Sequence, residues 1–366
     1  MATGKRVTMA QVARRAGVSR SAVTAALSDR VSTVGLNPAT RRQIRKVAEE
    51  LGYQPNILSR SFIKQRSYLI GMIATENFFL FTLETIKGIE DVLEATDYSL
   101  LAYYHGSGAE EQSKQLQKAI SRRVDGMIIM AAAEPADGPN HRQIAQMQKS
   151  GVPVVQIHRR AYPGVPTIMM DEEESSFLAV RHLIVLGHRR IAHVTYRGYR
   201  EPEFPGEHAE AQLRANGYAR AMRDAGLDPA ICEFDRAGHF GIGSNDYTGH
   251  CEATAQQLAD TARHFAAAKP RITGITTFND YTAIGLIHNF NALGMQVPRD
   301  VSIVGYDNTE AAVLMRPPLT TLRPRLFEIG RRSALAILQM MDGRSVEDAM
   351  LPPDLVVRGS TSRPVA

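Results

Sequence analysis

The apolar positions of residues 8–52 recur at helical spacing and predict three short helices. Apolar residues at 9, 12, 13 and 16 share one face of a first helix, which Thr8 caps. Gly17 then supplies a turn, and Ser19 caps a second helix that runs from Arg20 to about residue 27. A third helix begins after Asn37 and ends before Gly52. This arrangement is typical of a helix-turn-helix head that reads DNA, although a generic pair of packed helices would show the same apolar positions.

From residue 67 the pattern changes to near-continuous apolar runs that alternate with amphipathic helices. SYLIGMIA, VDGMIIMA and SIVGY are examples of the runs, and LETIKGIEDVLEA is one of the helices between them. Such runs indicate parallel strands that are covered on both faces. About ten such strands are more than a single sheet usually holds, so we expect two α/β lobes. We expect the ligand to bind between the lobes, at the carboxyl ends of the strands. The predicted fold class is therefore an all-α helix-turn-helix head joined to an α/β two-lobed body with two parallel sheets.

The charge of the chain is divided between these two parts. Residues 1–66 hold 13 lysines and arginines but only three acidic residues, which gives +10, whereas the whole chain carries +5. The body is therefore net acidic, with a charge of −5. A basic head on an acidic body indicates a nucleic-acid-binding module attached to a second function.

Several classes of protein find little support in the residues. No apolar run is long enough for a membrane span and no secretory signal is visible, so we expect a cytoplasmic protein without a membrane partner. The two cysteines, Cys232 and Cys251, are expected to be buried thiols in a reducing compartment. His188 and His193 lack a supporting carboxylate or cysteine cluster, and no nucleophile or phosphate-loop motif occurs. We expect no metal, no cofactor and no enzymatic activity.

The motifs of the head and body together resemble the LacI/GalR transcriptional regulators. In the head they are V-x-M-x-x-V-A-R-x-A-G-V-S-x-x-x-V, then T-R-x-x-I-x-x-x-A-x-x-L-G-Y-x-P-N and S-R-S-F. In the body they are RVDGM, GVPVV, HLIVLGH, VPRDVSIVGYDN and PPLTTLR. The resemblance implies a body with the fold of periplasmic sugar-binding proteins, in which the chain crosses between lobes three times.

The resemblance also implies a division into domains. Residues 1–55 would form the helix-turn-helix domain, 56–66 a hinge helix, and 67–366 the effector-binding and dimerisation domain. The crossings would lie near 166–170, 318–322 and 348–352. The N-lobe would then comprise about 67–166 and 321–348, and the C-lobe about 167–320 and 349–366.

The resemblance implies a set of residues that contact double-stranded DNA. Arg20, Ser21 and Ala25 would read base edges as exposed positions of the second helix, and Phe62 would enter the minor groove at the centre of a near-palindromic operator. Phe62 stands where the family has leucine and could instead contact the body, and Ser59 replaces the usual alanine. Ala25 offers only a methyl group where a polar reader is usual. The full expected set is Thr8, Met9, Ser19, Arg20, Ser21, Thr24, Ala25, Ser28, Asn56, Ser59, Arg60 and Phe62.

Seven further residues are expected to contact the small-molecule effector. Asp307 follows the strand SIVGY at its carboxyl end, and Arg214 stands where the family places an effector-binding arginine, although it could be a surface arginine. Asp171 is either a ligand contact or a cap at the hinge, and Phe79 and Phe81 line the cleft or pack in the core. Asn279 and Asp280 end another strand and would face the cleft. Glu172 replaces the family's usual asparagine, and the segment from 239 to 272 is longer than usual.

These inferences predict a sequence-specific DNA-binding regulator, and more narrowly a repressor. It would act as a homodimer or a higher oligomer, with an operator affinity that changes when a sugar or sugar derivative binds between the lobes. The alternative is a soluble sugar-binding protein or an α/β enzyme with an incidental basic helical head. Transport would require export, and an enzyme would require a catalytic constellation; the residues show neither.

Overall fold

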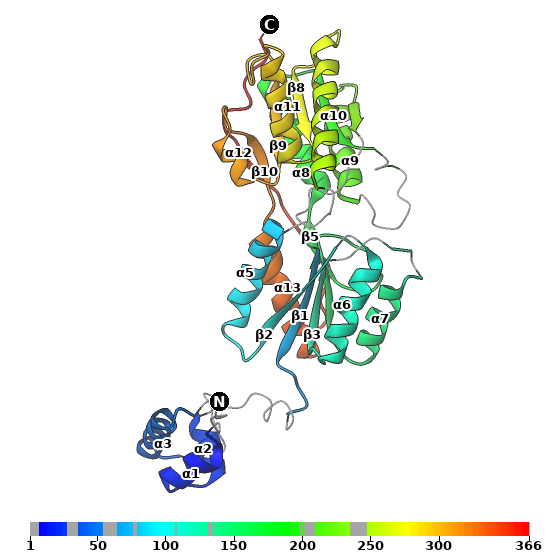
Figure 1. Ribbon diagram of the computed structural model, residues 1–366. Coiled ribbons are helices and arrows are strands. Elements are labelled where there is room, and N and C mark those ends of the chain that lie inside the picture. The colour runs from blue at the N-terminus through cyan, green and yellow to red at the C-terminus, as the bar shows by residue number, and fades with distance from the viewer. Residues whose placement is uncertain are drawn as a thin grey trace. The chain divides into compact units, whose positions relative to one another are not determined.

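A computed structural model describes most of the chain. It describes residues 7–27, 36–53, 64–75, 79–106, 108–130, 134, 135, 137–197, 200, 209–234 and 247–365, with the backbone alone at 79–81 and 247–254. The chain divides into two compact units, Met1–Ser67 and Tyr68–Ala366 (Figure 1). We refer to them as the head and the body. In the described parts of both units, no helix combines the length and apolar character needed to cross a bilayer.

The head contains the three predicted helices, α1 (Met9–Ala16), α2 (Arg20–Leu27) and α3 (Pro38–Glu50). Gly17 ends α1 with φ 68°, a conformation that side-chain-bearing residues rarely adopt. The Ser19 hydroxyl accepts a hydrogen bond from the Ala22 amide and so caps α2, as expected. Val12, Val23 and Ile44, one from each helix, are fully buried against one another. The helix-turn-helix prediction is confirmed.

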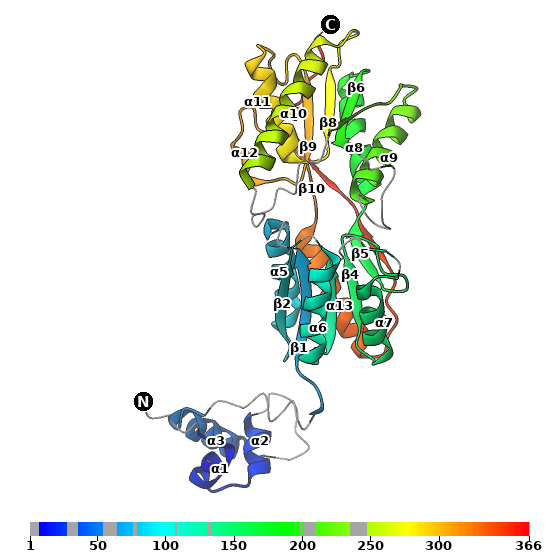
Figure 2. The ribbon, with the colours of Figure 1, turned by 45° about the vertical axis from the view of Figure 1, so that its right-hand side comes forward.

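The first lobe of the body is a six-stranded parallel sheet between two pairs of helices. The strand order is β11-β5-β4-β3-β1-β2. The strands are β1 (Leu69–Thr75), β2 (Ser99–His105), β3 (Gly126–Met130), β4 (Val154–Ile157), β5 (Thr167–Met170) and β11 (Ala349–Leu351). Helices α5 (Phe79–Leu93) and α13 (Leu326–Met341) cover one face, and α6 (Ala109–Ser121) and α7 (Pro139–Lys149) cover the other (Figure 2).

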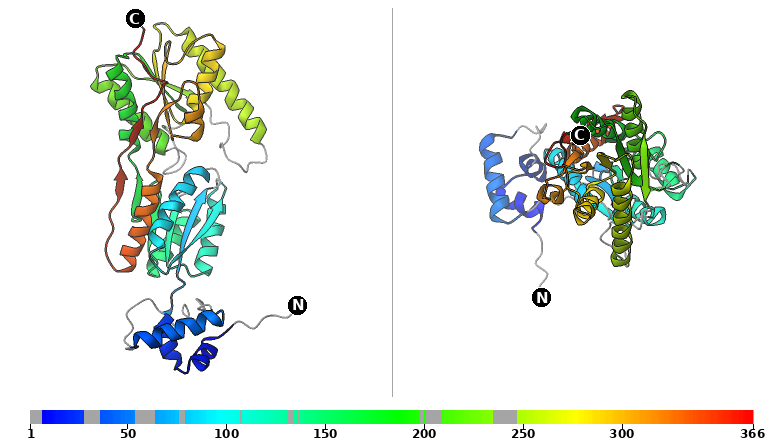
Figure 3. Two further views of the ribbon diagram at one scale, coloured as in Figure 1. Left: turned by 90° about the vertical axis from the view of Figure 1, so that its left-hand side faces the viewer. Right: turned by 90° about the horizontal axis from the view of Figure 1, so that it is seen from above.

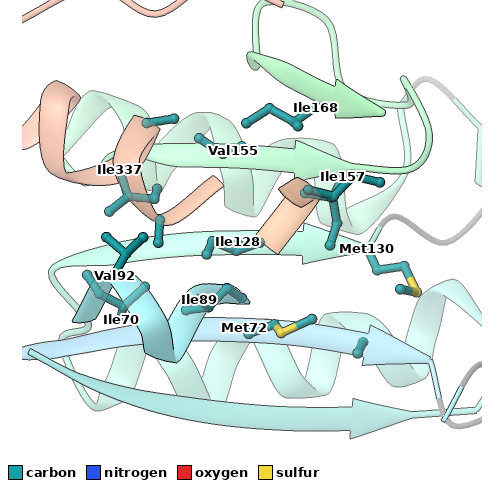
Figure 4. Close-up of a cluster of buried hydrophobic side chains, with 14 of the residues drawn as sticks. Ile70, Met72, Ile89, Val92, Ile128, Met130, Val155, Ile157, Ile168 and Ile337 are labelled. Atoms are coloured by element: carbon teal, nitrogen blue, oxygen red, sulfur yellow. The ribbon is translucent and has the colours of Figure 1, made fainter. Parts of the chain in front are cut away.

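The core under α5 and α13 explains why these distant segments pack together. Ile70, Ile128 and Val155 from three strands meet Ile89 of α5 and Ile337 of α13 in one buried cluster (Figure 4). The two helices approach closely because glycines stand at their crossing. A Cβ atom at Gly330 would lie 2.0 Å from the Thr85 carbonyl oxygen. Helix α13, which comes late in the sequence, therefore completes the first lobe.

The second lobe is also a six-stranded sheet, with order β12-β10-β9-β8-β6-β7. The strands are β6 (Ile191–Tyr196), β7 (Ala230–Phe234), β8 (Gly274–Thr277), β9 (Ser302–Tyr306), β10 (Thr320–Arg323) and β12 (Asp354–Val356). Helices α8 (Glu172–Leu186) and α9 (Ala209–Asp224) cover one face, and α10 (Tyr247–Ala267), α11 (Asp280–Ala292) and α12 (Glu310–Leu314) cover the other. Strand β12 pairs antiparallel with β10, so this sheet is mixed, not wholly parallel as expected.

The chain passes between the lobes three times, a few residues later than the resemblance implied. Strand β5 still pairs with β4 of the first sheet, so the first crossing follows it, at Asp171. Strand β10 belongs to the second sheet, so the second crossing lies between Arg323 and Leu326. The third joins β11 to β12 through Pro352 and Pro353, and Figure 3 shows these last strands, in red, as one continuous run. Each strand completes its own sheet before the chain leaves the lobe.

Candidate nucleic-acid interface and ligand site

The exposed side of α2 carries a short row of polar groups. Arg20, Ser21 and Thr24 are all exposed. The Ser21 hydroxyl lies 2.8 Å from that of Ser19, which fixes both at the start of the helix. The Thr24 hydroxyl donates to the Arg20 carbonyl oxygen at 3.0 Å. Within the described head, the Arg20 guanidinium has no recorded partner, so it is the group on this face that is free to bind another molecule.

Ala25 does not belong to this exposed row. It is only 4% exposed, and it stands three residues after Ala22, which is also buried. Ala22 and Ala25 therefore face the packed side of the helix, whereas Arg20, Ser21 and Thr24 are exposed. The expectation that Ala25 is an exposed position is wrong, and a covered methyl group cannot contact a base edge in this arrangement.

The remaining expected DNA contacts divide into supporting residues and residues outside the described chain. The Thr8 hydroxyl and amide both donate to the Gln11 side chain, and the half-buried Met9 accepts from Thr24 through its sulfur. Thr8 therefore caps α1, and Met9 joins α1 to α2. Five other expected contacts lie outside the described residues: Ser28, Asn56, Ser59, Arg60 and Phe62.

Basic side chains of α3 extend the positive surface of the head. Three basic residues of α3 are exposed: Arg42, Arg45 and Lys46. The Lys46 side chain is 78% exposed, although its Nζ lies 3.9 Å from a Glu50 carboxylate oxygen. Arg45 has a structural task as well, because its Nε donates to the Ala26 carbonyl oxygen at the end of α2. This surface offers charge for phosphate groups, whereas α2 offers groups that can distinguish bases.

In the body, charged groups gather at the carboxyl ends of the second sheet. Arg214 is 7% exposed and projects from α9 toward this edge. Its Nε donates to Glu172 at 2.8 Å and its Nη1 to the Phe278 carbonyl oxygen at 2.5 Å. Its guanidinium carbon lies 3.4 Å from the centre of the Tyr306 ring and 4.5 Å from that of Phe278. Arg214 is therefore not a surface arginine. We name Glu172, Arg214, Phe278, Tyr306 and Asp307 the arginine cluster.

Asp307 follows β9 directly, as expected, and has an unusual backbone. Its φ is 113°, which a side-chain-bearing residue rarely adopts, so the surrounding structure must hold it there. Burial raises the pKa of its carboxyl group well above the ordinary value, and Arg214 opposes that rise. Among the described residues, no donor is recorded for this carboxylate. A strained carboxylate without a protein partner is a group that a ligand can satisfy.

Three other expected ligand residues have structural roles here. Asp280 is completely buried, and its two oxygens accept from the hydroxyl of Thr321 at 2.6 Å and the amide of Thr309 at 2.8 Å. Asn279 caps α11 by accepting from the Thr282 amide. Asp171 caps α8 by accepting from the Glu174 amide, which favours the hinge-cap alternative. The expectation that Asp280 faces the cleft is wrong, because its oxygens join three segments of the lobe interior.

The sequence alone did not identify the partners of Arg214. In the sequence, Glu172 differs from the asparagine that is usual in the family, and its position directly after Asp171 places it beside the lobe crossing. Tyr306 ends β9 and Phe278 directly follows β8, and each stands immediately before an expected ligand residue; this position is the signal in the sequence that could identify them. Phe79 begins α5, but its side chain and that of Phe81 lie outside the described residues.

The two histidines considered as metal ligands are held by other groups. His188 bonds to the Thr273 hydroxyl and to the Ser362 carbonyl oxygen. His193 Nδ1 lies 3.0 Å from the Thr276 hydroxyl, and its ring stacks on Tyr218. Within the described chain, no group of three or more histidine, cysteine, aspartate or glutamate residues could hold a metal ion.

Comparisons with known proteins match both units. A model of bacterial regulatory proteins of the lacI family matches residues 8–56, and a model of the periplasmic binding protein-like domain matches residues 180–361. The chain is 28% identical to catabolite control protein A of Priestia megaterium over 361 residues, covering 97% of this chain and 99% of that protein. It is 29% identical to the HTH-type transcriptional repressor CytR of Escherichia coli (strain K12), covering 97% and 96%.

Solved structures show the same fold. The crystal structure of the Lac repressor dimer bound to operator and the anti-inducer ONPF superposes with a TM-score of 0.76 at 24% identity, covering 98% of this chain and all of that one. A complex of the transcriptional regulator CelR with cellobiose gives a TM-score of 0.62 at 24% identity, covering 97% and 100%.

Proposed function

Because the chain belongs to the LacI family of bacterial regulatory proteins, we propose that it is a repressor that binds a near-palindromic operator as a homodimer and responds to a sugar or sugar derivative. Its relatives of known function are transcriptional repressors and regulators that bind DNA, not enzymes. The observation that carries the proposal is the exposed polar face of α2 on a head with a charge of +10.

DNA binding in this proposal divides between two surfaces. Lysines and arginines of the head neutralise phosphates, which gives affinity that falls steeply with salt. Arg20 on α2 forks onto a guanine in the major groove, which is worth about 1–3 kcal/mol of discrimination against another base. Ser21 contacts a neighbouring base edge, and Thr24 stands close to the backbone. Phe62, by the family pattern, wedges into the minor groove at the centre of the site.

The dimer follows from the operator and from a relative. A near-palindromic site presents two equivalent half-sites, which two heads related by a twofold axis would occupy. The Lac repressor, which shares the fold of this chain, is a dimer on its operator. We propose the same assembly here, with the body supplying the contact between copies.

The effector is proposed to bind at the arginine cluster. Asp307 provides a carboxylate for which no donor is recorded among the described residues, and Tyr306 and Phe278 hold Arg214 in the same cluster. Hydroxyl groups of a sugar can donate to such a carboxylate. CelR, one of the similar structures, is solved with cellobiose. Binding there changes operator affinity by coupling the two lobes to the head, with a typical coupling of about 1–3 kcal/mol.

Footprinting of genomic DNA beside the protein's own gene tests this proposal. Protection of a near-palindromic site is expected, and the genes next to it indicate which compounds to add. A compound from that pathway should change the protection at the same protein concentration. Absence of any sequence-selective protection, with or without such compounds, would contradict the repressor assignment.

A further inference from the structure

The charge of Arg214 is already balanced inside the protein. Glu172 accepts from its Nε at 2.8 Å, and both side chains are only 8% exposed. A guanidinium paired in this way attracts an anionic ligand far less than a free one, because the partner carboxylate repels the same anion. An arginine at this place in the fold therefore does not by itself indicate an anion-binding site.

The charged groups recorded around Asp307 in the described part of the chain give the site no excess of positive charge. Arg214, Asp280 and Glu172 act on the Asp307 carboxyl, which is one guanidinium against two carboxyl groups. Arg358 acts in turn on Asp280 and keeps its own charge, because its guanidinium donates to two neutral groups, the Asn308 side chain and the Leu319 carbonyl oxygen. His193 adds no positive charge, because burial and then Arg214 lower its pKa to about 3.

Uncharged polar groups without partners complete the surroundings. Among the described residues, the Thr195 hydroxyl and the His193 Nε2 are buried and have no recorded hydrogen-bond partner. His193 and Thr195 alternate along β6 and so share a face of the sheet. Buried polar atoms of this kind are satisfied by neutral donors and acceptors, which a polyhydroxyl compound supplies.

We propose that the effector is a non-anionic polyhydroxyl compound that donates hydroxyl or amine hydrogens to Asp307, and that the Glu172–Arg214 pair excludes phosphorylated and carboxylated compounds. This inference rests on the proposed function, since it concerns the ligand of the same site. It assigns Glu172 as the residue that sets specificity against anions.

Inorganic phosphate is the probe for this inference, with thermal unfolding of the full chain as the measurement. Phosphate should not stabilise the wild-type protein through Arg214. In the Glu172→Gln variant the Arg214 guanidinium loses the charge of its partner. Phosphate, added at ten times its dissociation constant from this variant, should raise the unfolding midpoint by about 2 °C or more. The double variant Glu172→Gln with Arg214→Gln should lose this response. Glu173→Gln is the matched control. Glu173 is the neighbour of Glu172 on α8, and it pairs with Arg220, which lies on α9 like Arg214 but is more exposed. This variant should behave as wild type.

Two results would overturn the inference. One is a phosphate response of the wild-type protein that Arg214→Gln abolishes, because it would show that Arg214 binds anions despite Glu172. The other is a folded Glu172→Gln variant with no phosphate response. Any binding of phosphate to the basic head is common to all variants and is subtracted by the comparison. Because unfolding is read without DNA, failure of operator binding would leave this result intact and would count against the proposed function alone.

Discussion

Arg159 and Glu210 form an ion pair between the two lobes of the body, with 3.2 Å between the Arg159 Nη2 and a Glu210 carboxylate oxygen. Arg159 follows β4 of the first lobe, and Glu210 lies in the first turn of α9 in the second. Their side chains are 20% and 23% exposed, so water screens the pair only in part. A movement of one lobe against the other must stretch this contact.

We predict that Arg159→Gln and Glu210→Gln destabilise the body non-additively. Partial burial places the coupling energy of the pair at about 1 kcal/mol, the upper end for exposed pairs. Urea unfolding of wild type, both single variants and the double variant measures it. Arg160→Gln is the control, because the neighbouring Arg160 also loses an ion-pair partner, Asp348, but this pair is more exposed and lies within the first lobe. Its effect should stay below about 1 kcal/mol. Strictly additive effects would show that the pair contributes nothing between the lobes.

His193 makes the stability of the body depend on pH. Burial first, and then Arg214, lower its pKa to about 3 in the folded protein, against about 6.5 when unfolded. Between these values the unfolded chain binds the extra proton, so stability rises with pH and is lost as pH falls below about 6.5. The contribution of one such histidine is about 1 kcal/mol per pH unit in that window.

We therefore predict that His193→Gln flattens the pH profile of urea unfolding between pH 6.5 and 4.5. His158, whose pKa burial lowers to about 4, acts in the same direction, and Asp280, whose pKa burial raises to about 6, acts in the opposite one. Both remain in wild type and variant, so the difference between the two profiles isolates His193. Parallel profiles would contradict the assignment.

Two aspartates near one another should respond differently to the same change. Asp280→Asn places an amide donor against the Thr309 and Thr321 donors, and should lower the free energy of unfolding by about 1–3 kcal/mol. Asp307→Asn replaces a half-buried carboxyl group for which no donor is recorded among the described residues, and should leave stability unchanged or higher. Thermal unfolding of both variants separates the structural carboxylate from the one available to a ligand. Equal losses would place Asp307 among the structural residues.

The head offers a matched pair of substitutions for DNA binding. Arg20→Ala removes the group that can fork onto a base, so it should cost about 1–3 kcal/mol at the preferred site and much less elsewhere. Lys46→Ala removes a phosphate contact, so it should weaken all sites alike and lower the salt slope by about 1. Fluorescence anisotropy on a set of operator variants measures both. Identical effects of the two changes on every sequence would contradict the division between base and phosphate contacts.

Local patterns predict the head helices and many of the strands of this fold. Helical periodicity and caps such as Ser19 located the head helices, and apolar runs such as SIVGY located the strands. The two lobes followed from the number of runs. The antiparallel strand β12 cannot be predicted in this way, because its three residues are too few to show a periodic pattern.

The site was predicted less completely, since it depends on contacts between distant residues. Glu172 and Arg214 are 42 positions apart, and Asp280 and Thr321 are 41 apart, so no local pattern reveals either pair. An aspartate that follows a strand gives the same sequence pattern in two cases. Its carboxylate can be available to a ligand, as at Asp307, or it can bond to segments of the lobe interior, as at Asp280. The exposure of Ala25 cannot be predicted from the sequence, because the way in which the eight-residue helix α2 packs on its neighbours decides which small side chains are covered.

The central claim is that the head recognises a particular DNA sequence, and operator affinity as a function of salt tests it most directly. Binding of the full chain to the footprinted fragment and to a scrambled fragment of equal composition would be compared from about 50 to 200 mM salt. We predict a steep fall of both affinities with salt, and a preference for the footprinted fragment of about 10³-fold or more. Equal affinity for the two fragments at every salt concentration would contradict it.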